Sequence, residues 1–140
     1  MIEYISKSVK ETESIAAQLA KDLRGGEVIA LSGNLGAGKT VLVRGLAKAL
    51  GLKDNINSPT FVLLKVYNLK YKKIKRFIHV DCYRLEGQED LHDIGLGDYL
   101  SDPENLVVIE WADRIKNLPA NAIRVSLDHI ANDQRRIQIS

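Results

Sequence analysis

The sequence predicts an α/β fold, in which one domain over residues 1–140 is built around a mixed, mostly parallel central sheet of about seven strands. Three observations predict it. Short apolar runs bounded by turns, at 28–31 and 106–109, are typical of buried parallel strands. Segments with helical spacing alternate with them. The region 60–81 has the pattern of two strands joined by a short turn, which makes the expected sheet mixed.

The amino-terminal part of the chain predicts a strand followed by a helix. Residues 1–5 form the strand, and Ser8 with Glu11 fits a capping box at the start of the helix. Gly25 and Gly26 end this helix, because glycine adopts the left-handed turn at low cost. The apolar face expected from the helical spacing consists of Ile15, Ala16, Leu19, Ala20 and Leu23.

The remaining elements are predicted by the same patterns. In chain order they are a strand over 27–32, a helix over 39–50 closed by Gly51, strands over 60–67 and 74–81, a helix over 89–100, and strands over 106–110, 122–127 and 136–139. The helix over 89–100 contains Gly95 and Gly97, which weaken the helical pattern.

Composition narrows the class of protein. Hydrophobic residues make up 45% and charged residues 27% of the 140 residues, which favours a globular core over disorder. No apolar run approaches the roughly 20 residues of a membrane helix, and residues 1–5 lack the pattern of a secretion signal. One cysteine, Cys82, cannot form an internal disulfide. We therefore expect a cytoplasmic protein with no membrane partner.

The charge of the chain indicates less about its binding partners than composition does about its class. The formal net charge of +2 is too small to imply nucleic-acid binding by bulk electrostatics. One local run is basic and is favoured as the solvated tip of a hairpin, with a docking surface for RNA or an acidic partner as the alternative. This run consists of Lys70, Lys72, Lys73, Lys75 and Arg76.

The segment Gly33–Thr40 matches the phosphate-binding pattern G-x-x-x-x-G-K-[ST], with a predicted strand before it and a predicted helix after it. Its glycines permit backbone angles that let amide hydrogens surround phosphate oxygens, and the helix adds its free amides and dipole. Lys39 should bridge the β- and γ-phosphates, and the Thr40 hydroxyl should bind Mg²⁺. We expect the nucleotide to contact Asn34, Leu35, Gly36, Ala37, Gly38, Lys39, Thr40 and Val41.

Such a loop needs an acid near the magnesium, at the end of a neighbouring strand. Glu110 and Asp81 each follow a predicted apolar strand, at the edge where open α/β sheets bind ligands. One would hold the metal while the other orients water or senses the γ-phosphate, and the sequence leaves open which does which. Trp111 adjoins Glu110 and is expected near the nucleotide. His79, beside Asp81, is expected to be structural.

Four motifs together resemble the TsaE (YjeE) ATPases of bacteria. They are Gly33–Thr40, Ser58–Phe61, His79–Leu85 and Ile109–Trp111. Their order, their spacing and the chain length match this family over nearly the whole chain. The resemblance implies a three-layer sandwich like that of P-loop NTPases.

The resemblance also implies a function. The family assists formation of N6-threonylcarbamoyladenosine in tRNA together with a complex of TsaB and TsaD. A member would bind ATP and Mg²⁺ and hydrolyse ATP slowly, with stimulation by these partners, and would contact tRNA only indirectly or weakly. Hydrolysis would reset the TsaD-containing complex between rounds.

Residue roles carry over by position. The resemblance implies that Lys39 contacts phosphate and that Thr40 and Glu110 hold Mg²⁺. It makes Asp81 an acid needed for hydrolysis, so that Asp81, Lys39 and Glu110 form the catalytic set. Thr60 would lie in a switch-like segment that senses the γ-phosphate, and Trp111 would lie near the site.

Three other functions compete with this one. A small-molecule kinase would need an acceptor pocket and a lid, for which 140 residues leave little room. A regulatory GTPase would carry D-x-x-G after the glycine loop and N-K-x-D for guanine, and neither occurs. A non-catalytic nucleotide-binding module would not need both Asp81 and Glu110.

Overall fold

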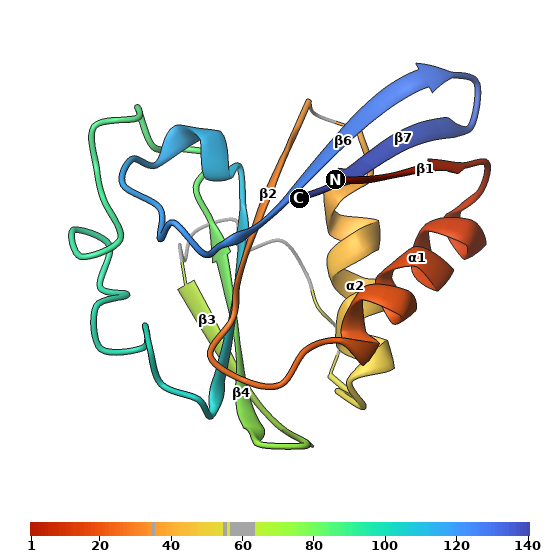
Figure 1. Ribbon diagram of the computed structural model, residues 1–140. Coiled ribbons are helices and arrows are strands. Elements are labelled where there is room, and N and C mark those ends of the chain that lie inside the picture. Colours follow the sequence, from red (N-terminus) through yellow and green to blue (C-terminus); the bar gives the residue numbers. More distant parts are fainter. Residues whose placement is uncertain (35, 55, 57–63) are drawn as a thin grey trace.

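A seven-stranded sheet organises the computed structural model, which describes residues 1–34, 36–54, 56 and 64–140. The strands lie in the order β1-β7-β6-β2-β5-β4-β3 (Figure 1). Their bounds are β1 (Ile2–Ser6), β2 (Val28–Gly33), β3 (Leu64–Tyr71), β4 (Ile74–Asp81), β5 (Asn105–Glu110), β6 (Ile123–Ala131) and β7 (Gln134–Ile139). The helices are α1 (Val9–Lys21), α2 (Lys39–Ala49) and the short 3₁₀ helix η1 (Ala112–Arg114).

Strand direction changes between the centre and the edges of the sheet. The four central strands β6, β2, β5 and β4 pair in parallel. Antiparallel pairs flank them, β1 with β7 and β7 with β6 at one edge and β3 with β4 at the other. The predicted mixed sheet of about seven strands is confirmed, with parallel pairing confined to its centre. The parallel centre brings the carboxyl ends of β2, β5 and β4 to one edge.

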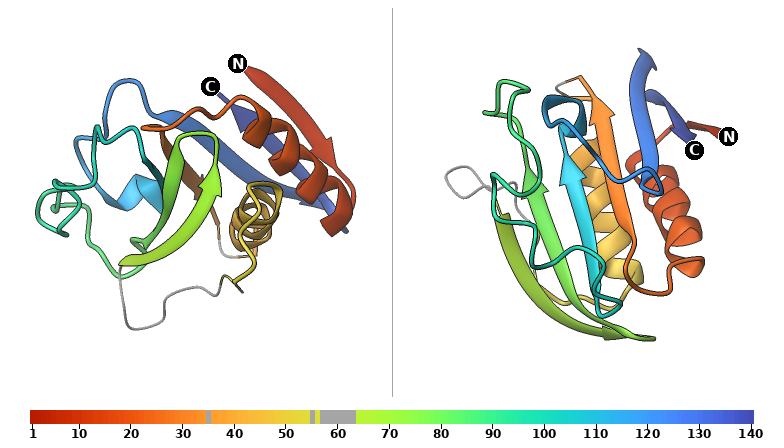
Figure 2. Two further views of the ribbon diagram at one scale, coloured as in Figure 1. Left: turned by 90° about the horizontal axis from the view of Figure 1, so that it is seen from below. Right: turned by 60° about the vertical axis from the view of Figure 1, so that its left-hand side comes forward.

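Helices α1 and α2 cover one face of this sheet (Figures 1 and 2). The predicted cap is present at α1, where Ser8 Oγ accepts a hydrogen bond of 3.1 Å from Glu11 N–H. The two helices pack closely at Gly45, where an added Cβ would lie 3.0 Å from Glu13 Cα and 3.1 Å from Ala16 Cβ. Within the described ranges no helix has the length and apolar character that crossing a membrane requires.

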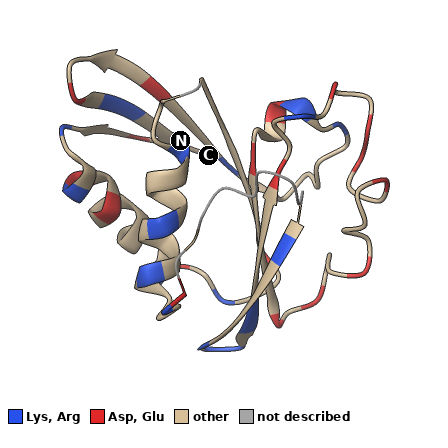
Figure 3. Cartoon of the chain, turned by 180° about the vertical axis from the view of Figure 1, so that it is seen from behind, with Lys and Arg blue, Asp and Glu red and all other residues tan. Residues whose placement is uncertain are grey.

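The opposite face is covered by η1 and by irregular chain over residues 82–104 (Figure 2). The predicted helix over 89–100 is wrong, because this segment is a series of turns. Gly95 has a positive φ of +86°, which interrupts helical backbone. Leu91 and Leu96 are buried against the sheet from separate turns, so their apolar spacing reflects contact with the sheet and not one helix face. Acidic residues are spread along this layer (Figure 3).

The predicted hairpin with the basic run is formed by β3 and β4. Residues 60–63 of the predicted first strand lie outside the described residues. Lys72 in the turn donates to Lys21 O at 3.0 Å and to Leu23 O at 3.2 Å, so it caps the carboxyl end of α1. Lys75 pairs with an acid near the start of β5, as does Arg76. Three of the five basic side chains therefore have structural partners.

Candidate functional site

The glycine loop joins β2 to α2 and folds around the amino end of that helix. Gly33, Gly36 and Gly38 have φ of +149°, +80° and +101°. A Cβ at Gly33 would lie 2.4 Å from Leu127 O on β6, so no other residue fits there without a shift of the backbone. The first turn of α2, which begins at Lys39, has backbone amides with no partner inside the helix, and such a helix end is suited to an anion.

Lys39 begins α2, and its side chain lies inside this loop with only 5% of the residue exposed. Its Nζ donates to Gly33 O and, at 2.9 Å, to Asn34 O. It also lies 3.9 Å from the centroid of the Trp111 ring, within the range of a cation–π contact. Burial lowers the pKa of Lys39, and the negative charges of Glu110 and other acids partly oppose this shift. The structure thus places a desolvated ammonium group against two loop carbonyls and the Trp111 ring.

Glu110, at the carboxyl end of β5, lies beside Thr40 of α2. Only 2% of Glu110 is exposed, and its Oε1 accepts a hydrogen bond of 3.2 Å from Thr40 Oγ1. Its Oε2 lies 2.5 Å from Nε2 of the buried His79. The parallel pairing of β2 with β5 brings Glu110 level with Leu31, just before the glycine loop.

A hydroxyl and a carboxylate side by side are the oxygen ligands that Mg²⁺ prefers, so these residues fit the expected metal. No cluster of three or more His, Cys, Asp or Glu side chains suited to a metal occurs in the described part of the chain.

Asp81 ends β4 directly beside Glu110, because β4 and β5 are parallel and these two residues are in register. Its Oδ1 accepts a hydrogen bond of 2.9 Å from Tyr83 N–H. Burial raises the pKa of Asp81, the Tyr83 N–H lowers it, and the charge of Glu110 raises it further. Two carboxyl groups and the Lys39 ammonium therefore share one edge of the sheet.

Trp111 forms a stack with two side chains that the sequence did not predict to act together. Its backbone has a positive φ of +58°, and its ring centroid lies 5.0 Å from that of Tyr83. The Arg114 guanidinium lies 4.7 Å from the Trp111 centroid and 5.0 Å from the Tyr83 centroid, and it donates to Tyr83 O. The sequence signal that could have identified Arg114 is its position three residues after Trp111, because the turn of η1 brings the two side chains onto the same side.

The remaining predicted contacts divide in two. Asn34, Gly36, Ala37, Gly38 and Val41 lie in the loop and the first turn of α2. Leu35 and Thr60 lie outside the described residues.

A cavity of about 340 Å³ adjoins the loop at Gly38 and Val41. The sequence did not predict this cavity, because its walls come from the amino end of α1 and from the β6–β7 hairpin. Its lining consists of Lys7, Ser8, Val9, Thr12, Gly38, Val41, Asp133 and Arg135.

A parallel sheet with this loop after one strand and an acid at the end of the next defines a P-loop NTPase-like α/β protein. A solved structure agrees with this class. The crystal structure of Bacillus subtilis YdiB matches with a TM-score of 0.77 and 29% sequence identity, covering 99% of this chain and 83% of that chain.

The particular family follows from sequence comparison. A family model described as threonylcarbamoyl adenosine biosynthesis protein TsaE matches residues 6–137. A Treponema pallidum relative is 36% identical over 137 residues, covering 97% of this chain and 98% of the relative. A Rickettsia bellii relative is 37% identical over 140 residues, covering 99% and 94%. Both are named tRNA threonylcarbamoyladenosine biosynthesis protein TsaE. The chain belongs to the TsaE family, as the sequence resemblance predicted.

Proposed function

We propose that this protein binds ATP with Mg²⁺ and hydrolyses the ATP in support of N6-threonylcarbamoyladenosine modification of tRNA. The observation that carries the proposal is the group formed by the glycine loop, the Lys39 ammonium inside it, and the Thr40–Glu110 pair beside it. The family's role in this tRNA modification supports the biological half of the proposal.

The present contacts of Lys39 support phosphate binding. Its ammonium group is held by two neutral carbonyl oxygens, Gly33 O and Asn34 O, in a buried place. Negatively charged phosphate oxygens are stronger partners for a desolvated ammonium than neutral carbonyls. The β- and γ-phosphates of ATP would therefore take Lys39 from these carbonyls, while the loop amides bind the same phosphates.

The carboxyl groups of Glu110 and Asp81 would have different roles. Glu110 would hold Mg²⁺ together with Thr40, because their side chains already touch. When bound, Mg²⁺ neutralises charge on the phosphates. Asp81 would orient a water and accept its proton as the water oxygen bonds to the γ-phosphorus, while the bond from that phosphorus to the ADP oxygen breaks. Burial raises the pKa of Asp81, which makes it a stronger base than an ordinary aspartate.

The rest of the nucleotide would extend from the loop into the cavity at Gly38 and Val41. The cavity volume of about 340 Å³ is in the usual range for a small-molecule site. We place the base there because Gly38 is shared by the cavity and the loop. Thr60 would sense the γ-phosphate.

Partners complete the proposal. TsaB and TsaD would stimulate the slow hydrolysis, and hydrolysis would reset their complex between rounds in the cytoplasm. Contact with tRNA would be indirect or weak, since the net charge is only +2. A kinase would instead transfer the γ-phosphoryl group to an acceptor, and a binding module would leave ATP intact.

The test replaces Lys39 with alanine and measures Mg·ATP affinity by calorimetry. Phosphate release is then followed for the protein alone, with TsaB and TsaD, and with tRNA added. Loss of one charge-stabilising group should lower turnover by about 10²- to 10³-fold and weaken ATP binding. Lys48→Ala, an exposed lysine on the last turn of the same helix, is the matched control. Unchanged affinity and turnover in Lys39→Ala would exclude the proposed site, and a phosphorylated acceptor would favour the kinase.

A further inference from the structure

The contact between His79 and Glu110 joins two strands inside the site. His79 lies on β4 and is 0% exposed, and Glu110 lies on the neighbouring β5. The 2.5 Å separation of His79 Nε2 from Glu110 Oε2 is a hydrogen bond. The other carboxylate oxygen, Oε1, accepts from the Thr40 hydroxyl. The Glu110 carboxylate is thus held at both oxygens, by β4 on one side and by α2 on the other.

His79 occupies a position that packing alone would fill with an apolar side chain. Phe77 precedes it on the same face of β4 and packs into the core beneath α1 and α2, where Val108 of β5 also packs. His79 and Val108 are paired in the register of β4 with β5. Burial of an imidazole at such a place costs free energy unless hydrogen bonds compensate.

The second ring nitrogen of His79 shows where the ring's hydrogen bonding is directed. Nδ1 is buried and has no hydrogen-bond partner among the described residues. Among the described residues, the only hydrogen bond of the His79 ring is the one between Nε2 and Glu110 Oε2. The ring is committed to the carboxylate of Glu110.

We propose that His79 is a positioning residue for Glu110. A hydrogen bond from Nε2–H holds Oε2 and so keeps Oε1 directed at Thr40, which presets the pair that would hold the metal. Hydrogen bonds to a ligating carboxylate orient it in this way in many metal sites. The inference rests on the proposed function, since it assigns Glu110 and Thr40 to the metal.

Metal affinity tests this role, with Mn²⁺ as a paramagnetic substitute for Mg²⁺. Mn²⁺ binding to the ADP-saturated protein is titrated by electron paramagnetic resonance, and ADP affinity is measured separately in a chelator. His79→Leu removes the donor at similar volume and should weaken Mn²⁺ binding by about 10- to 100-fold, with metal-independent ADP affinity unchanged. His79→Gln, which offers an amide donor, should recover much of this loss.

The matched control is Phe77→Leu, two residues earlier on the same face of β4 and equally buried. It should lower the thermal midpoint and leave Mn²⁺ affinity unchanged. His79→Leu combined with Glu110→Gln should bind Mn²⁺ no more weakly than Glu110→Gln alone, because the histidine acts through that carboxylate.

Several outcomes overturn the inference. They are wild-type Mn²⁺ affinity in His79→Leu, an equal loss in Phe77→Leu, and a further loss on the Glu110→Gln background. A wild-type protein that binds no Mn²⁺ with ADP would instead contradict the proposed function. If His79→Leu does not fold, the imidazole Nε2–H proton of the wild type is followed by NMR. It should be protected from exchange and should shift in Glu110→Gln, and an unshifted proton also overturns the inference.

Discussion

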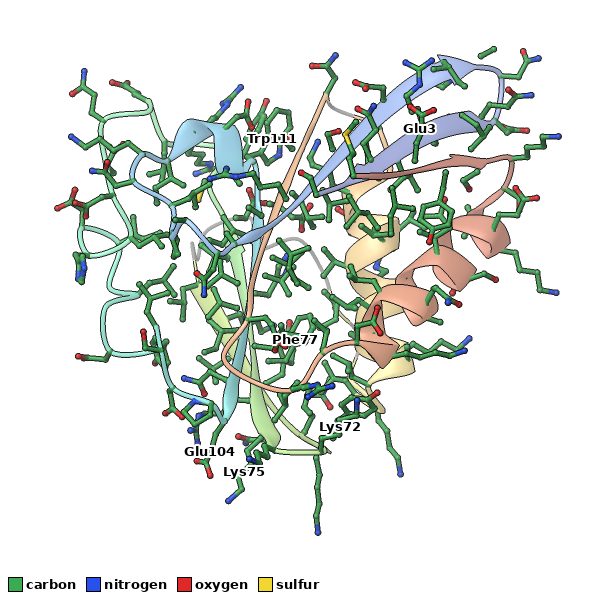
Figure 4. All side chains as sticks on the ribbon, viewed as in Figure 1. Glu3, Lys72, Lys75, Phe77, Glu104 and Trp111 are labelled. Carbon is green, nitrogen blue, oxygen red and sulfur yellow. The ribbon has the colours of Figure 1, made fainter. Side chains whose placement is uncertain are left out.

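Two groups of charged side chains lie at opposite ends of β4 and β5, and they differ in how well each charge is matched. Figure 4 shows Lys75 and Glu104 close together at one end and Trp111 of the candidate site at the other. The first group lies at the amino ends of the strands, where the side chains of Arg76, Asp102 and Glu104 are partly exposed. The second lies at the carboxyl ends and includes Lys39, Asp81 and Glu110.

At the amino ends, each charge has an opposite partner. Arg76 Nε donates to Asn105 Oδ1 at 2.6 Å, and its Nη2 donates to Asp102 at 3.3 Å and to Glu104 at 3.2 Å. Lys75 Nζ lies 3.0 Å from Glu104. The hydrogen bonds from Lys75 and then Arg76 lower the pKa of Glu104. Ionisation of Glu104 therefore favours the folded state.

At the carboxyl ends, burial works against the charges. It raises the pKa of Asp81 and lowers the pKa of Lys39, so the folded state disfavours the charged form of both. The same two strands thus carry a matched group at one end and an incompletely matched group at the other. Such mismatch is typical of functional sites, where binding or catalysis takes precedence over stability.

The largest expected effect is at Asp81. Under the proposed function, Asp81→Asn removes the base and should lower partner-stimulated turnover by about 10²- to 10⁴-fold, with ATP still bound. Phosphate release measures the turnover, and calorimetry measures the ATP affinity. In the wild type, turnover should fall as the pH drops through the raised pKa of Asp81. Asp22→Asn, an exposed change at the end of α1, is the control, and equal turnover in the two variants would remove Asp81 from the mechanism.

The next largest effect is on stability and concerns the charged group at the amino ends of β4 and β5. Arg76→Met removes the donor to the buried Asn105 Oδ1, which should lower the free energy of unfolding by about 1 to 3 kcal/mol. Urea denaturation measures this change. Turnover should be unchanged in the folded variant, because Arg76 lies at the other end of the strand. The control is Lys73→Met in the exposed hairpin turn, which should change neither the free energy of unfolding nor the turnover. A fall in turnover with Arg76→Met would show that the two ends are coupled.

The smallest effects are opposite changes in stability at Asp81 and Glu104. The pKa of Asp81 is raised by folding, so its contribution to stability is complete below its unfolded pKa and is lost as the pH rises through the raised value. The pKa of Glu104 is lowered by folding, so its contribution is present above its unfolded pKa and is lost as the pH falls through the lowered value.

At neutral pH, therefore, Asp81→Asn should raise the thermal midpoint and Glu104→Gln should lower it slightly. Thermal unfolding compared at neutral and strongly acid pH checks this, and both differences should shrink in acid. Midpoints that shift in the same direction for both variants would remove the contrast between the two ends of the strands.

Local patterns determined the glycine loop, the cap at Ser8, the strand Ile74–Asp81 and the family of the chain. The first three features depend on residues close together in sequence, since glycine conformation, helix capping and strand alternation act over a few positions. The family follows from several such local motifs taken together. The same reasoning identified Asp81 and Glu110, because each follows an apolar strand.

Tertiary packing decided the rest. Residues 89–100 form turns because burial of Leu91 and Leu96 against the sheet outweighs weak helical spacing interrupted by Gly95. The contact of His79 with Glu110 exists because β4 and β5 are adjacent, parallel and in a fixed register. Strand order and register depend on contacts between residues distant in sequence, and no local pattern encodes them.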